Sequence, residues 1–453
     1  MMVGRRNKSK QGCSRSLSDA NLAERETSFS HASSSAGGAR PRAKSQSPGA
    51  PMCMTDDERE GVRKLRIIAK QQLTRVPHFD TDFNLLRFYQ GHNRNVAAAA
   101  LFLTRHLKLR KFLGIDDGFE LDSCPIADQY YPIDVIGSTG KDDRYLVIEC
   151  PGRVDLQGLF KCIQLTRFIN WRVLFQEKMI KLFNQTERET GRQSSALLIM
   201  DLDGLVFESS LLGIVTGPYT CLCQHIFANY PECVSEVIVV NAPKFMPLLW
   251  KAITPFIPEH TRTKIKVYSR REEWEEVLLE KVAVDRLPAH WGGSLVDSNG
   301  DGRCQEILKI PEDRIPQELY WKPDERSPDP KELSTMILGP GSVGCRAFRV
   351  GHKSRTFLVL NTYIERKYSF AMFYSKDPQV LEDEKMEEWL PVVEMPGLPT
   401  VDYLKVPLPG PGAVKLRFGN ESAWFRSLAV QYRVDFVDDK GRQVKFHVDK
   451  QQQ

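Results

Sequence analysis

Residues 237–268 read Val-Ile-Val-Val (237–240), Asn-Ala-Pro (241–243), Lys-Phe-Met-Pro-Leu-Leu-Trp-Lys-Ala-Ile-Thr-Pro-Phe-Ile (244–257) and, after a polar break, Lys-Ile-Lys-Val-Tyr (264–268). Two short runs rich in β-branched residues bracket one apolar segment, which predicts a strand–helix–strand unit. Pro247 falls near the start of the predicted helix, where a missing N–H costs little, and Pro255 ends or kinks the helix.

This predicted helix is more apolar than a helix that covers one face of a sheet needs to be. Its apolar side chains occupy two adjoining sides of the helical wheel: Phe245, Leu249 and Phe256 on one, and Met246, Trp250, Ile253 and Ile257 on the other. Such a helix is buried on both sides, faces a partner, or covers something apolar. A core helix of an α/β sheet is the commoner case. A lid over a lipid pocket is the alternative that the rest of the chain favours.

Strand and helix signals alternate around this unit, within residues 121–297. Predicted strands at 133–137, 145–149 and 196–200 are joined by a hairpin and then by a long helix, 157–186. An apolar helical stretch follows at 208–229, interrupted at Gly217-Pro218. This alternation predicts a mostly parallel or mixed sheet with right-handed crossovers. Residues 55–120 carry only helical patterns, beginning with the capping box Thr55–Glu58, and predict a small helical subdomain.

The C-terminal part of the chain has a different pattern. Residues 298–335 are polar and proline-rich, which predicts a linker, and residues 336–450 carry short alternating strands. In the run 428–437, Leu, Val, Tyr, Val and Phe alternate with smaller or polar residues. Short strands without helices indicate a β-sandwich. The acidic insert 382–388 is predicted to be a solvated loop.

The net charge of +5 comes from the N-terminal tail, because residues 1–54 hold nine Lys/Arg and three Asp/Glu, which leaves the rest nearly neutral. This tail is rich in Ser, Ala and Gly and is predicted to be disordered. A nearly neutral body argues against nucleic-acid binding. We find no apolar run of the roughly 18 residues that a membrane span needs, and no signal peptide. The ten scattered cysteines lack a C-x-x-C pair and predict a reduced, cytoplasmic protein.

Six short motifs lie in the order and spacing of one known domain. They are Ile-Met-Asp-Leu-Asp-Gly (199–204), Tyr-Pro-Glu (230–232), Asn-Ala-Pro (241–243), Thr-Pro-Phe-Ile (254–257), Thr-Lys-Ile (263–265) and Leu-Pro…Gly-Gly (287–293). Together with Leu-Leu-Arg-Phe (85–88), they resemble the CRAL-TRIO lipid-binding proteins. Residues 411–420 and 425–428 resemble a GOLD domain. The pairing is similar to the supernatant protein factor and tocopherol-associated protein branch of the yeast phosphatidylinositol-transfer-protein family.

The resemblance implies an α/β CRAL-TRIO domain with a helical N-terminal subdomain, followed by an all-β, jelly-roll-like GOLD sandwich. It also implies that residues 244–257 contain a mobile gate over a hydrophobic pocket. The gate and pocket residues expected on this basis are Phe245, Met246, Leu249, Trp250, Ile253 and Phe256.

In relatives that bind phosphatidylinositol, a basic residue of the helical leader and a Glu, a Thr and a Lys hold the headgroup. The matching positions here are His92, Glu232, Thr261 and Lys264. A neutral imidazole pairs with phosphate less strongly than a guanidinium. The polar pair that relatives use for phosphatidylcholine is replaced by Ala196 and Leu198. The ligand therefore stays open between a phosphoinositide and a less polar tocopherol-, sterol- or squalene-like lipid, and a plain Glu232–Lys264 salt bridge is the alternative to headgroup contact.

The sequence thus predicts a cytoplasmic, peripherally membrane-associated lipid-binding and transfer protein that is not an enzyme. It needs no metal or cofactor besides the bound lipid. Its expected partners are a hydrophobic lipid, a transient membrane surface and a protein bound through the GOLD domain, with no nucleic acid. The alternative is a trafficking or signalling adaptor that acts through its GOLD domain and has a vestigial pocket.

Overall fold

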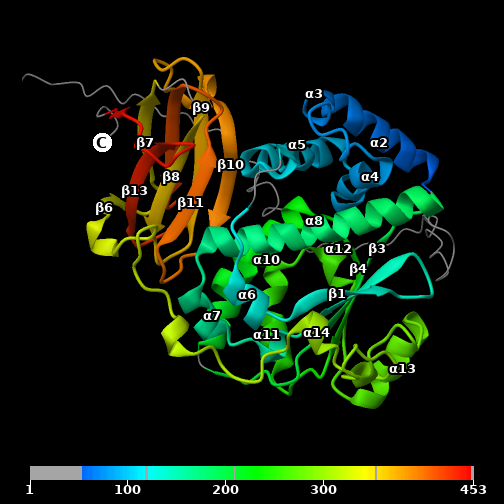
Figure 1. Cartoon of the computed structure of the whole chain (residues 1–453). Helices are drawn as coiled ribbons and strands as arrows, with labels where there is room; N and C mark the ends of the chain where they lie inside the picture. Colours follow the sequence, from blue (N-terminus) through cyan, green and yellow to red (C-terminus); the bar gives the residue numbers. More distant parts are fainter. Residues whose placement is uncertain (1–53, 118–120, 209, 352–354, 450–453) are drawn as a thin grey trace, which may run out of the picture. The chain divides into compact units, whose positions relative to one another are not determined.

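The computed structural model describes residues 54–117, 121–208, 210–351 and 355–449. The predicted disordered tail, residues 1–54, lies outside these ranges except for Met54. The described residues comprise a helical leader, an α/β part and a C-terminal β part, coloured from blue to red in Figure 1.

The helical leader begins at a capping box, in which the Glu58 N–H donates to the Thr55 hydroxyl and the Thr55 N–H donates to the Glu58 carboxylate. Its helices are α2 (Asp56–Ile68), α3 (Lys70–Leu73), α4 (Asp82–Gly91) and α5 (Val96–Leu113). Thr81 and Asn95 cap α4 and α5, and Gly114 ends α5 with a φ of 67°, a conformation that favours glycine. The apolar faces of these helices pack together into a core of their own.

The sheet of the α/β part has the order β1-β2-β3-β4-β5. Its strands are β1 (Ile133–Ser138), β2 (Arg144–Glu149), β3 (Ser195–Asp201), β4 (Val234–Val240) and β5 (Ile265–Val267). The first two strands form an antiparallel hairpin, and the others pair in parallel. The sequence predicted a mostly parallel or mixed sheet from the alternation of strand and helix signals, and the pairing agrees with it.

Helices surround the sheet, and several differ from their predicted bounds. They are α6 (Pro125–Tyr130), α7 (Leu156–Cys162), α8 (Leu165–Thr190), α9 (Leu211–Ile214), α10 (Thr220–Asn229), α11 (Met246–Ile253), α12 (Glu259–Arg262) and α13 (Arg271–Lys281). The helix predicted at 157–186 is two helices, because the backbone of Gln164 is extended, with φ −89° and ψ 135°. A 3₁₀ turn, η4 (Thr254–Phe256), follows α11 and begins one residue before Pro255.

The two faces of the sheet are both apolar but are covered differently. Residues that alternate along a strand point to opposite faces. On one face, Ile148, Ile199 and Ile238 pack with Trp274, Leu278 and other side chains into a closed core. Their sequence neighbours therefore point to the opposite face, toward α8, α10 and α11.

The expectation that no apolar run is long enough to span a membrane is wrong for residues 211–229. Taken as one helical stretch, Leu211–Asn229 has 19 residues and a mean hydropathy of 1.2, which is long and apolar enough to cross a membrane by length and composition. A core helix of a soluble protein meets the same criterion. The stretch is broken by a π-helical turn, η3 (Val215–Tyr219), in which Gly217 has φ −101° and ψ −106° before Pro218.

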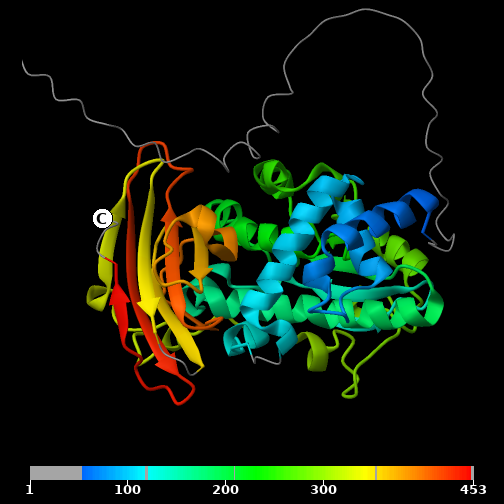
Figure 2. The same ribbon diagram turned by 90° about the horizontal axis from the view of Figure 1, so that it is seen from above.

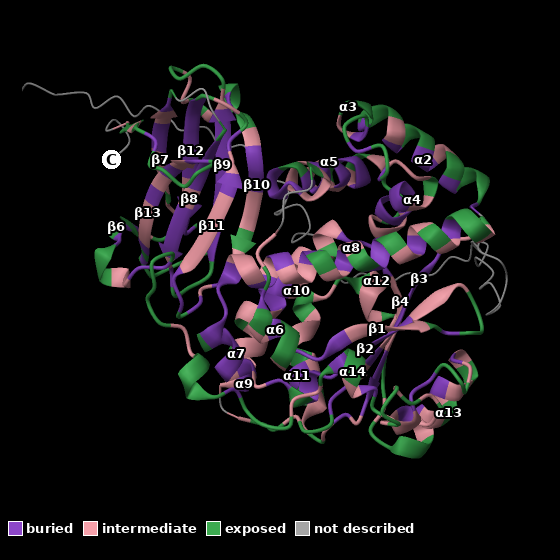
Figure 3. Cartoon of the chain, viewed as in Figure 1, coloured by how far each residue is buried: buried purple, intermediate pink, exposed green. Residues whose placement is uncertain are grey.

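The C-terminal strands form two antiparallel sheets, shown in yellow to red in Figures 1 and 2. One has the order β10-β9-β12-β7-β14 and the other β11-β8-β13-β6. The strands are β6 (Ser334–Leu338), β7 (Val343–Val350), β8 (Thr356–Tyr363), β9 (Tyr368–Ser375), β10 (Glu387–Met395), β11 (Asp402–Pro407), β12 (Gly412–Gly419), β13 (Leu428–Asp438) and β14 (Phe446–Val448). Ring contacts join the sheets, including Phe348 to Phe436 at 5.8 Å, and Figure 3 shows these strands mostly buried.

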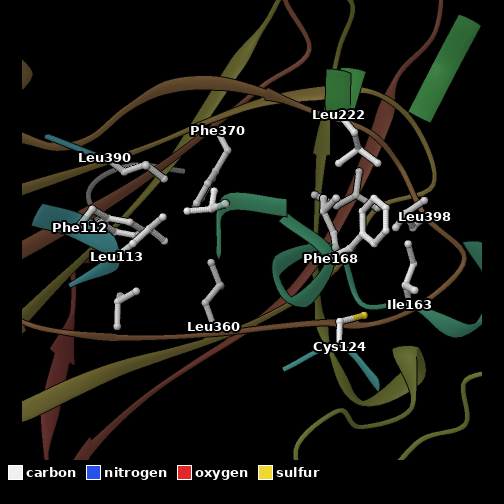
Figure 4. Close-up of a cluster of buried hydrophobic side chains, with 14 of the residues drawn as sticks. Phe112, Leu113, Cys124, Ile163, Phe168, Leu222, Leu360, Phe370, Leu390 and Leu398 are labelled. Carbon is white, nitrogen blue, oxygen red and sulfur yellow. The ribbon is translucent and has the colours of Figure 1, made fainter. Parts of the chain in front are cut away.

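The predicted acidic loop 382–388 is wrong at its end, where β10 begins. Glu387 and Glu388 are paired rather than merely solvated: Glu388 accepts from Lys108 of α5 at 2.7 Å and Glu387 from Lys111 at 3.0 Å. Beside them, the rings of Phe112 and Trp389 are 5.1 Å apart. Figure 4 shows Phe112 and Leu113 close to Leu390, Leu360 and Phe370 of the C-terminal sheets, so one apolar core continues from α5 into the sandwich.

The predicted linker also packs against the α/β part. It contains α14 (Gln305–Leu308) and the 3₁₀ turns η6 (Gln317–Leu319) and η7 (Pro330–Glu332). Leu308 and Ile315 are buried, and the Trp321 N–H donates to the Lys161 carbonyl at 2.8 Å. The polar composition of this segment did not indicate these contacts, because a few anchoring side chains are enough to hold it.

One buried ion pair joins the helical leader to the α/β part. The Arg87 guanidinium donates to the Glu187 carboxylate at 2.5 Å and to the Ser194 carbonyl at 2.7 Å, and both charged side chains are about 2–3% exposed. The Ser194 N–H donates to the same carboxylate. This network connects α4, α8 and the start of β3.

We expect the substitution Glu187→Gln to lower the free energy of unfolding by about 3–5 kcal/mol, because it leaves the buried Arg87 charge uncompensated. Urea denaturation with an unchanged m-value measures the loss. The control is Glu60→Gln, which breaks an exposed ion pair with Arg63 and should change stability little. Equal effects of the two substitutions would contradict the role given to Arg87–Glu187.

Candidate functional site

A cavity of about 240 Å³ lies against the second face of the α/β sheet. The sheet contributes side chains that alternate with the closed core of the first face: Val147, Ala196, Leu198, Met200, Val237 and Val239. Because each strand is apolar on both faces, the sheet can support a packed core on one side and an apolar cavity on the other.

Helices close the cavity on its remaining sides, and most of their contributing side chains are apolar. From α8 come Phe168, Ile169, Val173, Phe175 and Met179; from α10 come Leu222, Cys223, Ile226 and Phe227; and from α11 and η4 come Met246, Trp250, Ile253 and Phe256. A concave, mostly apolar site with a few polar groups is the usual form of a site for a hydrophobic small molecule.

The predicted gate residues divide into two sets. Met246, Trp250, Ile253 and Phe256 line the cavity. Phe245 and Leu249 do not line it. Phe245 contacts the ring of Phe207 at 5.3 Å, and Leu249 is the buried residue of α11. On the outer side of the helix, Leu248 is 48% exposed. The helix α11 is thus apolar toward the cavity and also toward its outer surface.

The predicted headgroup residues lie at the strand-start edge of the sheet. Thr261 and Lys264 line the cavity, and Lys264 Nζ donates to Glu232 Oε2 at 2.6 Å. His260 Nε2 is 3.7 Å from the other Glu232 oxygen. Glu232 borders an adjacent polar hollow together with Gln90, Arg94 and Ser235. The structure therefore brings Glu232, Thr261 and Lys264 together at the border of the cavity. Glu232 and Lys264 form an ion pair there.

His92 lies beside this group but does not line the cavity. Its Nδ1 is 2.9 Å from the Phe88 carbonyl oxygen, and its ring lies 4.3 Å from that of Phe102. Burial lowers the pKa of His92, and the nearby charge of Glu232 opposes that shift only in part. The imidazole is thus held neutral near neutral pH, and its pairing with phosphate is correspondingly weaker.

Sequence reasoning missed a group of polar side chains that also faces the cavity: Tyr131, Glu149, Arg172, Tyr219 and Cys223. These residues come from separate segments, namely the chain before β1, the end of β2, α8, the π-turn η3 and α10. The sequence held one indication of this polar group: Glu149 ends the apolar run of β2, and Arg172 interrupts an apolar side of α8. Nothing in the sequence indicated that the two meet.

Among the described residues no group of three or more His, Cys, Asp or Glu is placed to hold a metal ion. The Asp297 carboxylate accepts N–H groups of its own loop, from Asn299 and Asp301. These bonds make residues 297–301 a polar turn.

Comparisons with known proteins agree with this geometry. A family model of the CRAL/TRIO domain matches residues 131–293, and a model described as F28H7_8_C:-like, C-terminal domain matches residues 319–445. The chain is 30% identical over 375 residues to the CRAL-TRIO domain-containing protein F28H7.8 of Caenorhabditis elegans, covering 82% of this chain and 88% of that protein. The chain belongs to the CRAL-TRIO family. It is also 23% identical to the protein ctg-1 of Caenorhabditis elegans, covering 85% of this chain and 97% of that protein.

Among solved structures, the chain is similar to the crystal structure of Sfh5, with 15% identity and a TM-score of 0.38 over 52% of this chain and 95% of that one. CRAL-TRIO proteins bind and transfer lipids and other small hydrophobic ligands and are not known as enzymes. The CRAL-TRIO α/β fold and a β-rich C-terminal region, both predicted from the sequence, are confirmed.

The position of Trp250 in the cavity wall predicts a fluorescence signal. Bromine quenches indole emission on contact, so adding 1-bromododecane should reduce the fluorescence of the protein. We expect most of this quenching to disappear in Trp250→Phe, because none of the six other tryptophans is among the residues that line the cavity. The control is Trp424→Phe, which removes an 82% exposed indole of the β12–β13 loop and should leave the quenching in place. Unchanged quenching in Trp250→Phe would contradict ligand entry into this cavity.

Proposed function

We propose that this CRAL-TRIO protein holds one hydrophobic lipid in the cavity and exchanges it at membranes, with α11 and η4 as the gate. The observation that carries the proposal is the apolar cavity that one lightly packed, apolar helix covers. Exposing a lipid chain to water costs about 0.8 kcal/mol per methylene, or on the order of 14 kcal/mol for a chain of eighteen carbons. A carrier therefore needs a cavity nearly as apolar as the bilayer, and a cover that opens where both sides are apolar.

The outer surface around α11 supports transient insertion into a membrane. Leu248 and Phe256 are 48% and 38% exposed, and Val206 and Phe207 of the neighbouring loop are 63% and 43% exposed. Lys244 and Lys251 are exposed on the same segment, and lysines next to apolar groups suit an anionic membrane surface. On this proposal the protein is cytoplasmic and only peripherally membrane-associated.

The cavity favours a small lipid over a diacyl phospholipid. Its volume of about 240 Å³ lies just below the range of roughly 300–1,000 Å³ that is usual for sites of drug-sized molecules. Ala196 and Leu198 give the cavity wall no polar group at the positions that relatives use for phosphatidylcholine. A phosphoinositide would have to compete with Glu232 for Lys264. We therefore place a tocopherol-, sterol- or squalene-like molecule ahead of a phosphoinositide.

The C-terminal sandwich is proposed to be a GOLD domain that recruits a protein or an organelle surface. Trp424 and Phe425, in the loop between β12 and β13, are 82% and 91% exposed. Large aromatic side chains exposed side by side often take part in an interface. The same loop favours the second candidate function, an adaptor in which the sandwich acts alone and the cavity is vestigial.

Mass spectrometry of organic extracts tests the proposal. The purified protein should carry a lipid, and Leu198→Trp should reduce that lipid to background, because the larger side chain fills the cavity from the middle of β3. Circular dichroism and the denaturation midpoint show whether the variant is folded. Repeated absence of lipid from the unmodified protein, or the same biological activity with Leu198→Trp as without it, would favour the adaptor.

A substitution on the outer surface of α11 should affect lipid transfer without affecting lipid binding in the cavity. We expect Leu248→Glu to slow lipid transfer between vesicles at least about tenfold while leaving lipid bound, because a carboxylate enters the membrane interface less favourably than leucine by 1.4 kcal/mol or more. Val284→Glu adds the same charge at a 55% exposed residue outside the gate and serves as the control. Transfer that slows equally in both variants, or in neither, would count against α11 as the gate. Leu249→Glu and Trp250→Glu place a charge in the core and in the cavity wall, and should abolish both lipid transfer and lipid binding.

A further inference from the structure

The polar side chains at the β2 side of the cavity form a second polar region, distinct from the Glu232–Lys264 pair. They lie at the end of β2 and on α8, whereas the Glu232–Lys264 pair lies at the starts of β4 and β5. In the sheet order, β3 separates β2 from β4, and the two groups lie at opposite ends of these strands. The wall between them is apolar, so the cavity has a polar group at each of two opposite sides.

The geometry of this region leaves the guanidinium of Arg172 without a close acceptor. The Tyr131 hydroxyl donates to Glu149 Oε1 at 2.6 Å. Arg172 Nη1 is 4.0 Å from the same oxygen, which is too long for a hydrogen bond, and this buried nitrogen has no hydrogen-bond partner among the residues that the structure describes. The guanidinium instead lies over the rings of Tyr131, Trp171 and Phe175 at 5.6–5.7 Å.

An arginine that is balanced in charge but lacks hydrogen bonds is an unusual feature of a folded protein. A buried donor without a partner is expected to cost about 1–3 kcal/mol, and more where the group is charged. If Arg172 had only a structural role, a hydrogen-bonded Arg172–Glu149 pair would be the more stable arrangement. Arg172 lines the cavity and 16% of its side chain stays accessible, although Nη1 itself is buried, so the guanidinium lies at the cavity wall.

We propose that Arg172, with the hydroxyl of Tyr219, binds the oxygen-bearing end of a neutral lipid that carries one hydroxyl or carbonyl group. This rests on the proposed function, since it identifies which lipids the cavity takes. The oxygen accepts a hydrogen bond from the guanidinium, and the hydrocarbon extends along the apolar wall toward α11. The oxygen-bearing end therefore enters first.

The charges around the Arg172 guanidinium disfavour lipids that carry an acidic group. Glu149 already balances Arg172, so a fatty-acid carboxylate or a phosphate would add uncompensated negative charge beside a carboxylate. The other ionisable groups stay neutral: burial raises the pKa of Tyr131 and of Tyr219 well above the usual value, and burial raises the pKa of the Cys223 thiol to about 12. Burial opposes protonation of Arg172, yet Glu149 keeps its pKa raised, so it remains a cation. A neutral acceptor is the ligand group that changes none of these charges.

A matched series of sixteen-carbon probes tests the proposal. Hexadecane, hexadecan-1-ol and palmitate, each delivered from cyclodextrin, compete with 1-bromododecane, and recovery of Trp250 fluorescence measures their binding. The readout is the ratio of alcohol affinity to alkane affinity in each variant, because differences in partition between the probes cancel when variants are compared.

We expect this ratio to fall about tenfold to a hundredfold in Arg172→Met, the range that corresponds to loss of one hydrogen bond to a charged group. The control is Lys178→Met, which removes a cation from the same helix, where Lys178 is 52% exposed and paired with Asp134 on the surface. Its ratio should equal that of the unmodified protein.

Arg172→Met leaves Glu149 buried without its counter-charge, so the variant can be unstable. Tyr219→Phe removes only a hydroxyl, keeps the Arg172–Glu149 pair and should lower the ratio several-fold, which keeps the proposal testable without Arg172→Met. An unchanged ratio in Tyr219→Phe and in folded Arg172→Met overturns the proposal, and so does tighter binding of palmitate than of hexadecan-1-ol. If no probe displaces the bromoalkane or binds at all, the failure is that of the proposed lipid-carrying function instead.

Discussion

The structure depends on a sheet whose two faces are both apolar while only one is covered by close packing. Ile148, Ile199 and Ile238 are enclosed with Trp274 and Leu278, whereas the alternating side chains face a cavity of about 240 Å³. At about 24 cal/mol per Å³, an empty space of that size weakens folding by on the order of 6 kcal/mol. That is a large fraction of the 5–15 kcal/mol by which domains are usually stable. On the proposed function, a hydrophobic ligand that fills the cavity would recover part of this loss.

The helix α10 joins this cavity to the C-terminal sandwich. Cys223 and Ile226 line the cavity, while Cys221 Sγ donates to the Glu394 carbonyl at 3.2 Å and His225 Nε2 is 2.8 Å from the same oxygen. The same helix therefore carries ligand contacts on one side and sandwich contacts on the other. Because helices move as nearly rigid elements, a ligand that displaces α10 also changes its contacts with β10. The turn at Gly217-Pro218, where the backbone leaves the helical conformation, precedes this helix.

Local patterns determined most of the fold, and the sequence predicted those parts. The β-branched runs of β3 and β4, the caps Thr55 and Asn95, and the alternation in β13 each specify their element without reference to distant residues. The parts that were missed depend on tertiary contacts. Glu387 and Glu388 look like a solvated loop until Lys108 and Lys111 of α5 pair with them. The apolar helix α11 was predicted from its composition, but only the fold decides that Trp250 faces the cavity and Leu249 the core. The Arg172 group was invisible for the same reason, since its members come from segments up to about ninety residues apart in the sequence.

In this arrangement the side chains of α11 and of its N-cap residue fall into two sets with different contacts. Leu249 and Phe245 hold the helix to the protein, whereas Met246, Trp250 and Ile253 contact whatever occupies the cavity. On the proposed function, a bound lipid would pack against both sets and would stabilise the closed position of α11. Without a ligand, the second set loses its contacts, and only the first set opposes opening. At a membrane, Leu248 and the exposed face gain apolar contacts that water does not offer. On the proposed function, the closed and open states are each stabilised by an apolar surface, the lipid in one case and the bilayer in the other, and a helix with apolar side chains toward the cavity and with Leu248 on its outer side suits this exchange.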